Sequence, residues 1–315
     1  MTDKQLAAPD KERQVGLALG LSAFFLWGFL PAYYKLTTAV PADVVVAHRI
    51  LWSVVAVGAF LALRGRIGEV IAILRKPAIA FKLALSAAAI SVNWLVFIYA
   101  VEQNEILSVS FGYFANPLVS VAIGLIVLKE TLSRAQWVAI AIATFAVGVQ
   151  GVALGEIPWI SLALAFSFAT YGYLRKTVDV GASPGLLTEA LLLSPFAAAY
   201  LVWFGVSTGT DVTYVGDPWL LLALIGTGVV TAFPLALFAA GARRLPLTII
   251  GLMQYIAPSI QMLLAIFVYG EEVGEVRFAT FALIWVSLAI FTFDALKRSR
   301  DARRARTPKA APQAR

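Results

Sequence analysis

Three ionisable side chains interrupt the apolar stretches of this chain: His48, Arg49 and Glu189. Each lies roughly two helical turns inside its stretch, if the stretch is helical. A charge in apolar surroundings is costly, so such a group usually binds a charged ligand, carries a proton or pairs with another charge. Arg49 is the candidate partner of Glu189, but their mirrored depths in a ~30 Å apolar layer would leave them roughly 10 Å apart, so they could meet only if the helices tilt or a cavity closes. All three residues are candidates for gating or coupling. The alternative for Arg49 is a side chain that extends to the nearest surface.

Two prolines, Pro117 and Pro258, lie near the middle of apolar stretches and are 141 positions apart. A proline inside a helix removes the hydrogen bond to the carbonyl four residues earlier and bends the helix. These carbonyls belong to Tyr113 and Gln254. In apolar surroundings a free carbonyl needs a donor from protein, water or a ligand. We therefore expect two helix kinks beside a polar cavity; the alternative is a neighbouring helix that supplies the donors.

Polar and aromatic side chains accompany the kinks and the buried charges. Together they suit a small molecule with a hydrogen-bonding head and a flat or apolar body. The alternative for the aromatic residues is packing or a place at a membrane interface. The substrate-binding candidates are Trp27, Asn93, Trp94, Tyr113, Asn116, Tyr171, Gln254 and Tyr255.

The amino-acid composition indicates the class of protein to which these residues belong. Of 315 residues, 60% are hydrophobic and 14% are charged, and the mean hydropathy is +0.84. Stretches of roughly 20 apolar residues recur, each long enough to cross a bilayer as a helix. The sequence therefore predicts an all-α membrane protein with the lipid bilayer as a partner. The net charge of +7 does not indicate nucleic-acid binding, because eight of the 25 basic residues lie in the tail from Lys297 onward.

Several kinds of chemistry find no support in the sequence. The chain has no cysteine and one histidine, and it lacks a clustered acidic motif for metal-dependent chemistry. It also lacks the glycine-rich loop that binds ATP in P-loop proteins. We therefore expect no catalytic residue, no metal and no cofactor.

Ten membrane spans are expected from apolar length. The first is expected to be a retained helix rather than a cleaved signal peptide, since it lacks a small-residue cleavage site. The predicted spans cover residues 15–35, 42–63, 78–100, 107–128, 135–154, 157–174, 185–205, 218–240, 247–269 and 276–296.

Charges alternate between the loops. Basic residues gather at 64–82, 129–134, 175–176 and 243–244, whereas acidic residues occupy the intervening loops. Because basic loops stay in the cytoplasm, both termini are expected there. The divisions are a cytoplasmic tail (1–14), two five-helix units (15–155 and 156–297) and a basic cytoplasmic tail (298–315).

A shift of 141 positions relates the two units. It pairs His48 with Glu189 and Pro117 with Pro258, and it also pairs Glu130 with Glu271. Five is odd, so the second unit must be inverted relative to the first. Inverted repeats of this kind are typical of secondary transporters, whose sites lie near the midplane between the repeats. A duplication kept only for packing is the alternative.

Several motifs resemble the RarD branch of the EamA-type drug/metabolite transporters. They include FLWGFLPAYYK (25–35), PADVVVAHR (41–49), GYFANPL (112–118), YGYLRK (171–176) and QYIAP (254–258), with Asn93-Trp94 and the Glu130 end of the fourth span followed by SRAQW (133–137). The resemblance covers roughly residues 14–298. Ala257 departs from the repeat, because the equivalent Asn116 is polar, so the cavity need not be symmetric.

The resemblance implies a ten-helix permease of the bacterial inner membrane, formed from two inverted EamA repeats. Members are commonly labelled chloramphenicol-sensitivity proteins. The resulting expectation is a secondary transporter of small metabolites or amphenicol-like drugs that works by alternating access; a homo-oligomer is compatible with the sequence. The alternatives are a channel or scaffold, or a membrane-embedded enzyme.

Overall fold

The computed structural model describes residues 10–128, 133–154, 157–242, 244 and 253–306, and every regular element in these ranges is helical. This agrees with the predicted fold class. The elements are α1 (Asp10–Gly28), α2 (Leu30–Tyr34), the 3₁₀ helix η2 (Lys35–Thr37), α3 (Ala42–Leu63), α4 (Ile67–Leu74), α5 (Pro77–Glu102), α6 (Ile106–Leu128), α7 (Arg134–Leu154), α8 (Trp159–Lys176), α9 (Ala182–Thr208), α10 (Pro218–Ala242), α12 (Ile256–Phe267) and α13 (Glu275–Arg306).

Each predicted span overlaps a helix of the described chain. By length and apolar character, five of these helices can cross a membrane: α3, α5, α7, α9 and α10. The pair α1–α2 qualifies as a sixth if it is counted as one bent span. The protein is therefore a multi-pass membrane protein.

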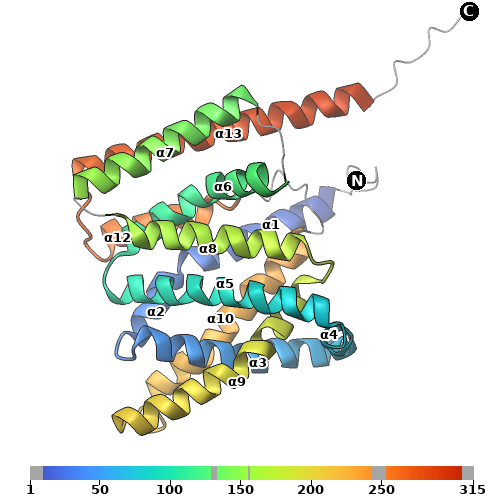
Figure 1. Cartoon of the computed structure of the whole chain (residues 1–315), viewed down its shortest axis with the longest axis vertical. Helices are drawn as coiled ribbons and strands as arrows, with labels where there is room; N and C mark the ends of the chain where they lie inside the picture. The colour runs from blue at the N-terminus through green and yellow to red at the C-terminus, as the bar shows by residue number, and fades with distance from the viewer. Residues whose placement is uncertain (1–9, 129–132, 155–156, 243, 245–252, 307–315) are drawn as a thin grey trace, which may run out of the picture.

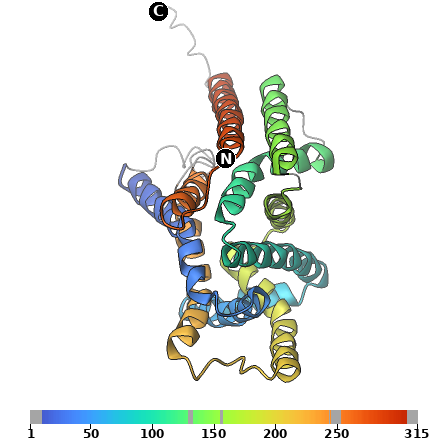
Figure 2. The ribbon, with the colours of Figure 1, turned by 90° about the vertical axis from the view of Figure 1, so that its left-hand side faces the viewer.

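The long helices lie side by side in a stack (Figure 1). Helices α3 and α9 pack against each other at one end of it, and α7 and α13 form a pair at the other end (Figures 1 and 2). Between them, α8 packs against α5 and α6, while α1 packs against α10 and α12. Helices α7 and α13 are thus peripheral in the stack.

Local sequence signals explain where several helices begin and end. Pro77 is the first residue of α5, a position where a missing N–H costs nothing. Asp217 accepts hydrogen bonds from the backbone N–H groups of Trp219 and Leu220 and so caps the start of α10. Helix α9 ends at Gly209, whose φ of +70° lies in the left-handed region that glycine tolerates.

The first predicted span is not a single straight helix. It breaks near Phe29 into α1 and α2, which are inclined by 42°. Pro31 explains the break, because it cannot donate to the carbonyl of Trp27 four residues earlier. The freed Trp27 carbonyl instead accepts a hydrogen bond from Gln261 Nε2 of α12, at 3.3 Å. The donor that compensates this kink therefore comes from the other half of the chain.

A short helix that the sequence analysis did not predict, α4, occupies part of the basic stretch 64–82. Val70 and Ile73 are buried, three positions apart, and α4 packs against α9, α5 and α3. The start of α1, the end of α13 and α4 all lie at the same side of the stack (Figure 1).

Glycines bring some helices unusually close. A Cβ at Gly228 of α10 would overlap the backbone of Trp52 in α3, and one at Gly112 of α6 would overlap the backbone of Ser161 in α8. Small residues at such contacts allow backbones to pack tightly inside a membrane. These contacts bring α10 close to α3 and α6 close to α8.

Candidate functional site

Arg49 lies on α3 and is only 6% exposed. Its guanidinium carbon is 4.1 Å from the ring centroid of Trp94 on α5 and 5.5 Å from that of Tyr34 on α2. A desolvated contact of this kind contributes about 2 kcal/mol. The side chain therefore does not extend to the surface; it is held between aromatic rings.

A hydrogen-bond network lies next to this cation. Asn93 is 2% exposed, and its Oδ1 accepts a hydrogen bond from the Tyr113 hydroxyl at 3.0 Å. Its Nδ2 donates to the Leu164 carbonyl and to Ser167 Oγ, both at 3.1 Å. Asn93 thus links α5 to α6 and α8, and its neighbour Trp94 contacts Arg49. The structure therefore brings Arg49, Asn93, Trp94 and Tyr113 together.

Five aromatic rings extend from this region, and we call them the aromatic series: Tyr34, Phe97, Tyr113, Phe168 and Tyr171. Successive ring centroids are 5.8, 6.1, 6.0 and 6.1 Å apart. Edge-to-face and tilted contacts at these distances are favourable. Tyr34 lies beside Arg49 at one end, and Tyr171 interacts electrostatically with Arg175 and Glu189 at the other. The series therefore connects two buried charged groups.

Glu189, on α9, is 1% exposed. Its Oε1 accepts a hydrogen bond from Ser86 Oγ at 2.6 Å and lies 3.7 Å from Arg175 Nε, whereas its Oε2 has no hydrogen-bond partner. The Arg175 guanidinium lies over Gly185, where a Cβ would overlap it. In this conformation the cation beside Glu189 is Arg175, at the end of α8, and not the candidate Arg49. Arg175 was expected only as part of a basic loop.

His48 has a different environment. Its Nε2 is 2.9 Å from the Val212 carbonyl, and its ring is 5.9 Å from that of Tyr214. Because a carbonyl only accepts, Nε2 carries the proton. His48 thus ties α3 to the loop between α9 and α10, although its neighbour Arg49 belongs to the aromatic site.

Trp27 lies outside the aromatic series. Its ring packs against Phe24 and Phe238 at centroid distances of 5.3 and 5.6 Å. Its carbonyl is the one bound by Gln261, whose own Oε1 is buried without a partner. Asn116 on α6 likewise has a buried Oδ1 without a partner. Since α6 packs against α12, these two helices carry two buried acceptors that have no donor.

The two predicted kinks differ. Helix α6 continues through Pro117 without interruption. Pro258 is the third residue of α12, in the first turn, where the N–H groups have no partner in the helix. It therefore does not bend a continuous helix midway, and residues 245–252 of the predicted ninth span lie outside the described residues. Just before α12, Gln254 is exposed and Tyr255 is half-buried.

A polar cluster that the sequence analysis did not predict ties the loop after α12 to the start of α6. Both carboxylate oxygens of Glu271 accept backbone N–H groups, from Ile106 at 2.7 Å and from Leu107 at 2.8 Å. Burial raises the pKa of Glu271, and the two backbone hydrogen bonds partly oppose this. Arg277 and Glu105 lie 3.7 Å apart in the same region. The repeat-related Glu130 lies outside the described residues.

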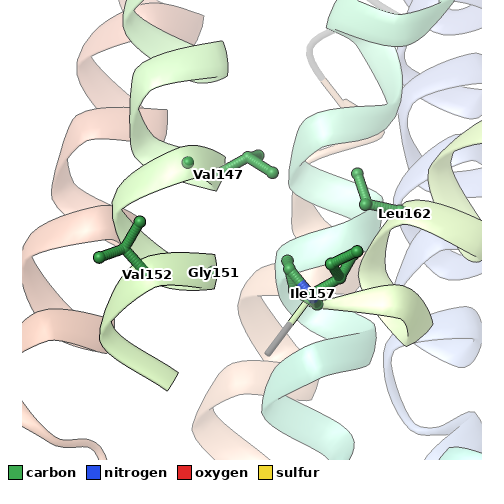
Figure 3. A pocket seen from close by; sticks show the side chains of 7 residues that line it. Val147, Gly151, Val152, Ile157 and Leu162 are labelled. Carbon is green, nitrogen blue, oxygen red and sulfur yellow. The ribbon is translucent and has the colours of Figure 1, made fainter. Parts of the chain in front are cut away.

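Two surface grooves lie outside this arrangement. The larger, of about 530 Å³, is apolar and lies between α7 and the start of α8, where Val147, Val152, Ile157 and Leu162 line it (Figure 3). The smaller, of about 280 Å³, lies between α3, α5 and α9 and carries Asp43 and Tyr200. Arg49 and Glu189 line neither groove. In the described part of the chain no three His, Cys, Asp or Glu side chains form a group that could hold a metal ion.

Comparisons with known proteins show the family. Residues 14–150 match the EamA-like transporter family. The chain is 44% identical to protein RarD of Salmonella typhimurium over 92% of this chain and 98% of the relative. It is 40% identical to an uncharacterized transporter of Vibrio cholerae, over 95% and 99%, and 30% identical to the chloramphenicol-sensitive protein RarD of Pseudomonas aeruginosa, over 90% and 95%.

A solved crystal structure supports the fold. It has a TM-score of 0.57 to this chain at 19% identity and covers 87% of this chain and 96% of its own. The chain belongs to the EamA-like transporter family, in the branch that contains the RarD proteins.

Proposed function

We propose that this protein is a secondary transporter of the bacterial inner membrane that moves a small organic molecule by alternating access. The membership in a family of transporters supports a transport function. The observation that carries the proposal is the aromatic series, which joins the buried Arg49 to the buried Arg175–Glu189 pair inside a bundle of apolar helices. Charges are retained inside membranes chiefly at functional sites.

The helix boundaries support two inverted repeats. Shifted by 141 positions, α3 and α5 fall on α9 and α10, and α7 falls on the first part of α13. The packing follows the same relation: α3 contacts its equivalent α9, α7 contacts α13, and α6 contacts α12. Such a relation gives two similar ways of packing the halves, which is the basis of alternating access in other transporters. We propose ten membrane spans, with both termini in the cytoplasm.

In this proposal the substrate site lies among α2, α3, α5, α6 and α8. Asn93, Trp94, Tyr113 and Tyr171 bind the polar and flat parts of the molecule, and α7 and α13 remain peripheral. Trp27 and Asn116 lie on helices of the first half that pack against the second half, and Gln254 and Tyr255 come just before α12; we propose that they line the cavity where the two halves meet. Pro117 is proposed to shape α6, and Pro258 lies in the first turn of α12. Amphenicols are candidate ligands, since one relative is named as a chloramphenicol-sensitive protein.

The Arg175–Glu189 pair supplies a candidate for gating or coupling. It joins the end of α8 to α9, at a distance of 3.7 Å. A carboxylate with one unpartnered oxygen in apolar surroundings can change partner or take up a proton when the helices move. His48 holds the loop before α10 and is proposed to stabilise one conformation.

The test combines binding with flux. A thermal-shift screen of metabolites and amphenicols on the purified protein identifies ligands, and counterflow in proteoliposomes measures exchange of the labelled ligand. Replacing Asn93 by Ala should reduce exchange, because it removes a network between three helices. Replacing Phe145 by Leu on the exposed face of α7 is the matched control. Rapid flux that does not saturate would indicate a channel, and flux insensitive to Asn93→Ala would contradict the site.

A further inference from the structure

In the described chain Arg49 combines burial with the lack of an ion pair, whereas the unpaired Arg64, Arg75 and Arg134 are exposed. Four arginines form ion pairs, Arg66 with Glu69, Arg175 with Glu189, Arg244 with Glu12 and Arg277 with Glu105. Arg49 is more buried than any of these, yet within the described residues no carboxylate lies within ion-pair distance of it. Its Nε is buried without a hydrogen-bond partner. The most enclosed arginine of the described chain is thus buried without a carboxylate as counter-charge.

We propose that Arg49 binds the carboxylate of the transported substrate, so that the substrate is a small organic acid with an aromatic or flat apolar body. This inference rests on the proposed transport function and names its substrate class. A cation–π contact lowers the cost of burying the guanidinium but does not neutralise it. In this proposal the negative charge of the ligand neutralises the Arg49 guanidinium.

The geometry around Arg49 fits this chemistry. The guanidinium carbon lies over the rings of Trp94 and Tyr34, 4.1 and 5.5 Å from their centroids. A guanidinium binds aromatic rings through its faces and carboxylates through the N–H groups in its plane. A guanidinium can therefore stack on a ring and bind a carboxylate at the same time. The unpartnered Nε–H is one of the in-plane donors that a bidentate carboxylate uses.

The charge balance favours a carboxylate over a phosphate monoester. A single guanidinium matches one negative charge, whereas a phosphate dianion would bring a second charge into apolar surroundings without a partner. The body of the ligand is set by the same neighbours. Trp94 flanks the cation, and the aromatic series continues from Tyr34 through Phe97 to Tyr113. These rings offer faces and edges to a flat ligand.

The experiment compares ligands that differ only in charge. The protein is reconstituted in phosphatidylcholine nanodiscs, and binding of indole-3-acetate, benzoate and cinnamate is measured against the corresponding carboxamides by intrinsic fluorescence and thermal shift. At least one acid should bind about tenfold to a hundredfold more tightly than its amide, the range for losing a charge-assisted hydrogen bond. Equal binding within every pair, or no acid bound at millimolar concentration, would overturn the proposal.

Variants assign the effect to the residue. Arg49→Met should remove the preference for the acid, while Arg49→Lys should keep part of it, because lysine retains the charge without the planar fork. Arg64→Met is the control, since Arg64 is exposed at the end of α3 over Phe60. If Arg49→Met does not fold, the proposal is still tested by the preference for acid over amide in Arg49→Lys and in the wild-type protein. An unchanged preference in Arg49→Lys and in a folded Arg49→Met would overturn the proposal.

Two further measurements separate the alternatives. Phosphatidylglycerol in the nanodiscs should not compete with the acid; competition that depends on Arg49 would make an anionic lipid the occupant and refute a solute carboxylate. Counterflow in proteoliposomes separates this inference from the proposed function. Acid binding that needs Arg49 without any flux would refute transport alone. Saturable flux of neutral solutes that is indifferent to Arg49 would refute the inference alone.

Discussion

Glu271 holds the first residue of α6, Ile106, through a hydrogen bond of 2.7 Å from the backbone N–H to the carboxylate. The second carboxylate oxygen takes the N–H of Leu107. The glutamate thus caps a helix of the first half from a loop of the second half. A negative charge at a helix N-terminus also interacts favourably with the helix dipole. In an alternating-access cycle this contact would close one side of the protein.

Removing this cap should destabilise the described conformation. Glu271→Ala leaves two helix N–H groups without an acceptor, so the free energy of unfolding should fall by about 1–2 kcal/mol. Glu271→Gln keeps one acceptor and should cost less. Melting of the purified protein in detergent measures both. The neighbouring Glu272 is exposed, and Glu272→Ala is the matched control; an equal loss in the two alanine variants would show that the cap contributes nothing.

The orientation in the membrane can be tested because the chain contains no cysteine. Single cysteines at the exposed positions Lys76, after α4, and Glu272, after α12, should react differently with an impermeant maleimide applied to whole cells. Basic loops resist translocation, so the cysteine at 272 should be labelled and the one at 76 protected until the cells are permeabilised. The reverse pattern would invert the proposed topology.

Much of the fold could be predicted because long apolar stretches specify membrane helices almost by themselves. Pro31 shows the limit. It belongs to a predicted span, but its effect depends on Gln261, 230 positions later, which supplies the donor for the freed carbonyl. The polar residues near Pro117 and Pro258 drew the sequence-based prediction to those two prolines, and Pro31 was not singled out. The sequence predicts that a carbonyl freed by a proline needs a hydrogen-bond donor. It does not predict at which proline another helix supplies that donor.

The sequence predicted several residues of the candidate site but not the residues that they contact. Buried charge singled out Arg49 and Glu189, and the structure finds both buried. Their partners were not predictable. Arg175 ends a helix beside Lys176 and resembles a surface anchor, and only the space over Gly185 lets its guanidinium turn toward Glu189. Tyr34, Phe97 and Phe168 gave no signal, since aromatic residues are common in membrane helices.

The Pro31–Gln261 relationship predicts coupling between the two positions. Gln261→Ala leaves the Trp27 carbonyl without its donor, so the free energy of unfolding should fall by about 1–3 kcal/mol. Pro31→Ala supplies a backbone N–H that can reach the same carbonyl. The Gln261→Ala cost should therefore shrink in the Pro31→Ala background. A double-mutant cycle from detergent melting measures this; additive effects would mean that Gln261 does not compensate for the proline.

The two repeat-related prolines should respond differently to alanine. Pro117 lies inside α6, so Pro117→Ala should restore a backbone hydrogen bond and straighten the helix. Counterflow should fall by more than expression does. Pro258 lies in the first turn of α12, where proline is tolerated, so Pro258→Ala should change transport little. If both variants transport normally at normal expression, the kinks have no part in the site.

Glu189 is the residue on which the proposed coupling mechanism depends. In this conformation it pairs with Arg175 and accepts from Ser86, while one oxygen has no partner. Glu189→Gln keeps the shape and the Ser86 hydrogen bond but removes the charge and the titration. Accumulation driven by a pH gradient should be lost, whereas exchange of labelled substrate between the two sides should largely remain, because exchange needs no net proton movement.

The partner variant separates loss of coupling from misfolding. Glu189→Gln alone leaves the Arg175 charge buried, and breaking a buried pair typically costs 3–5 kcal/mol. Adding Arg175→Gln should recover much of that stability and restore exchange if misfolding had reduced it, without restoring accumulation. Both activities are measured on the same proteoliposomes, with and without the gradient. Equal loss of accumulation and exchange in the stabilised double variant would point to substrate binding by Glu189, and unchanged accumulation in Glu189→Gln would exclude it as the proton carrier.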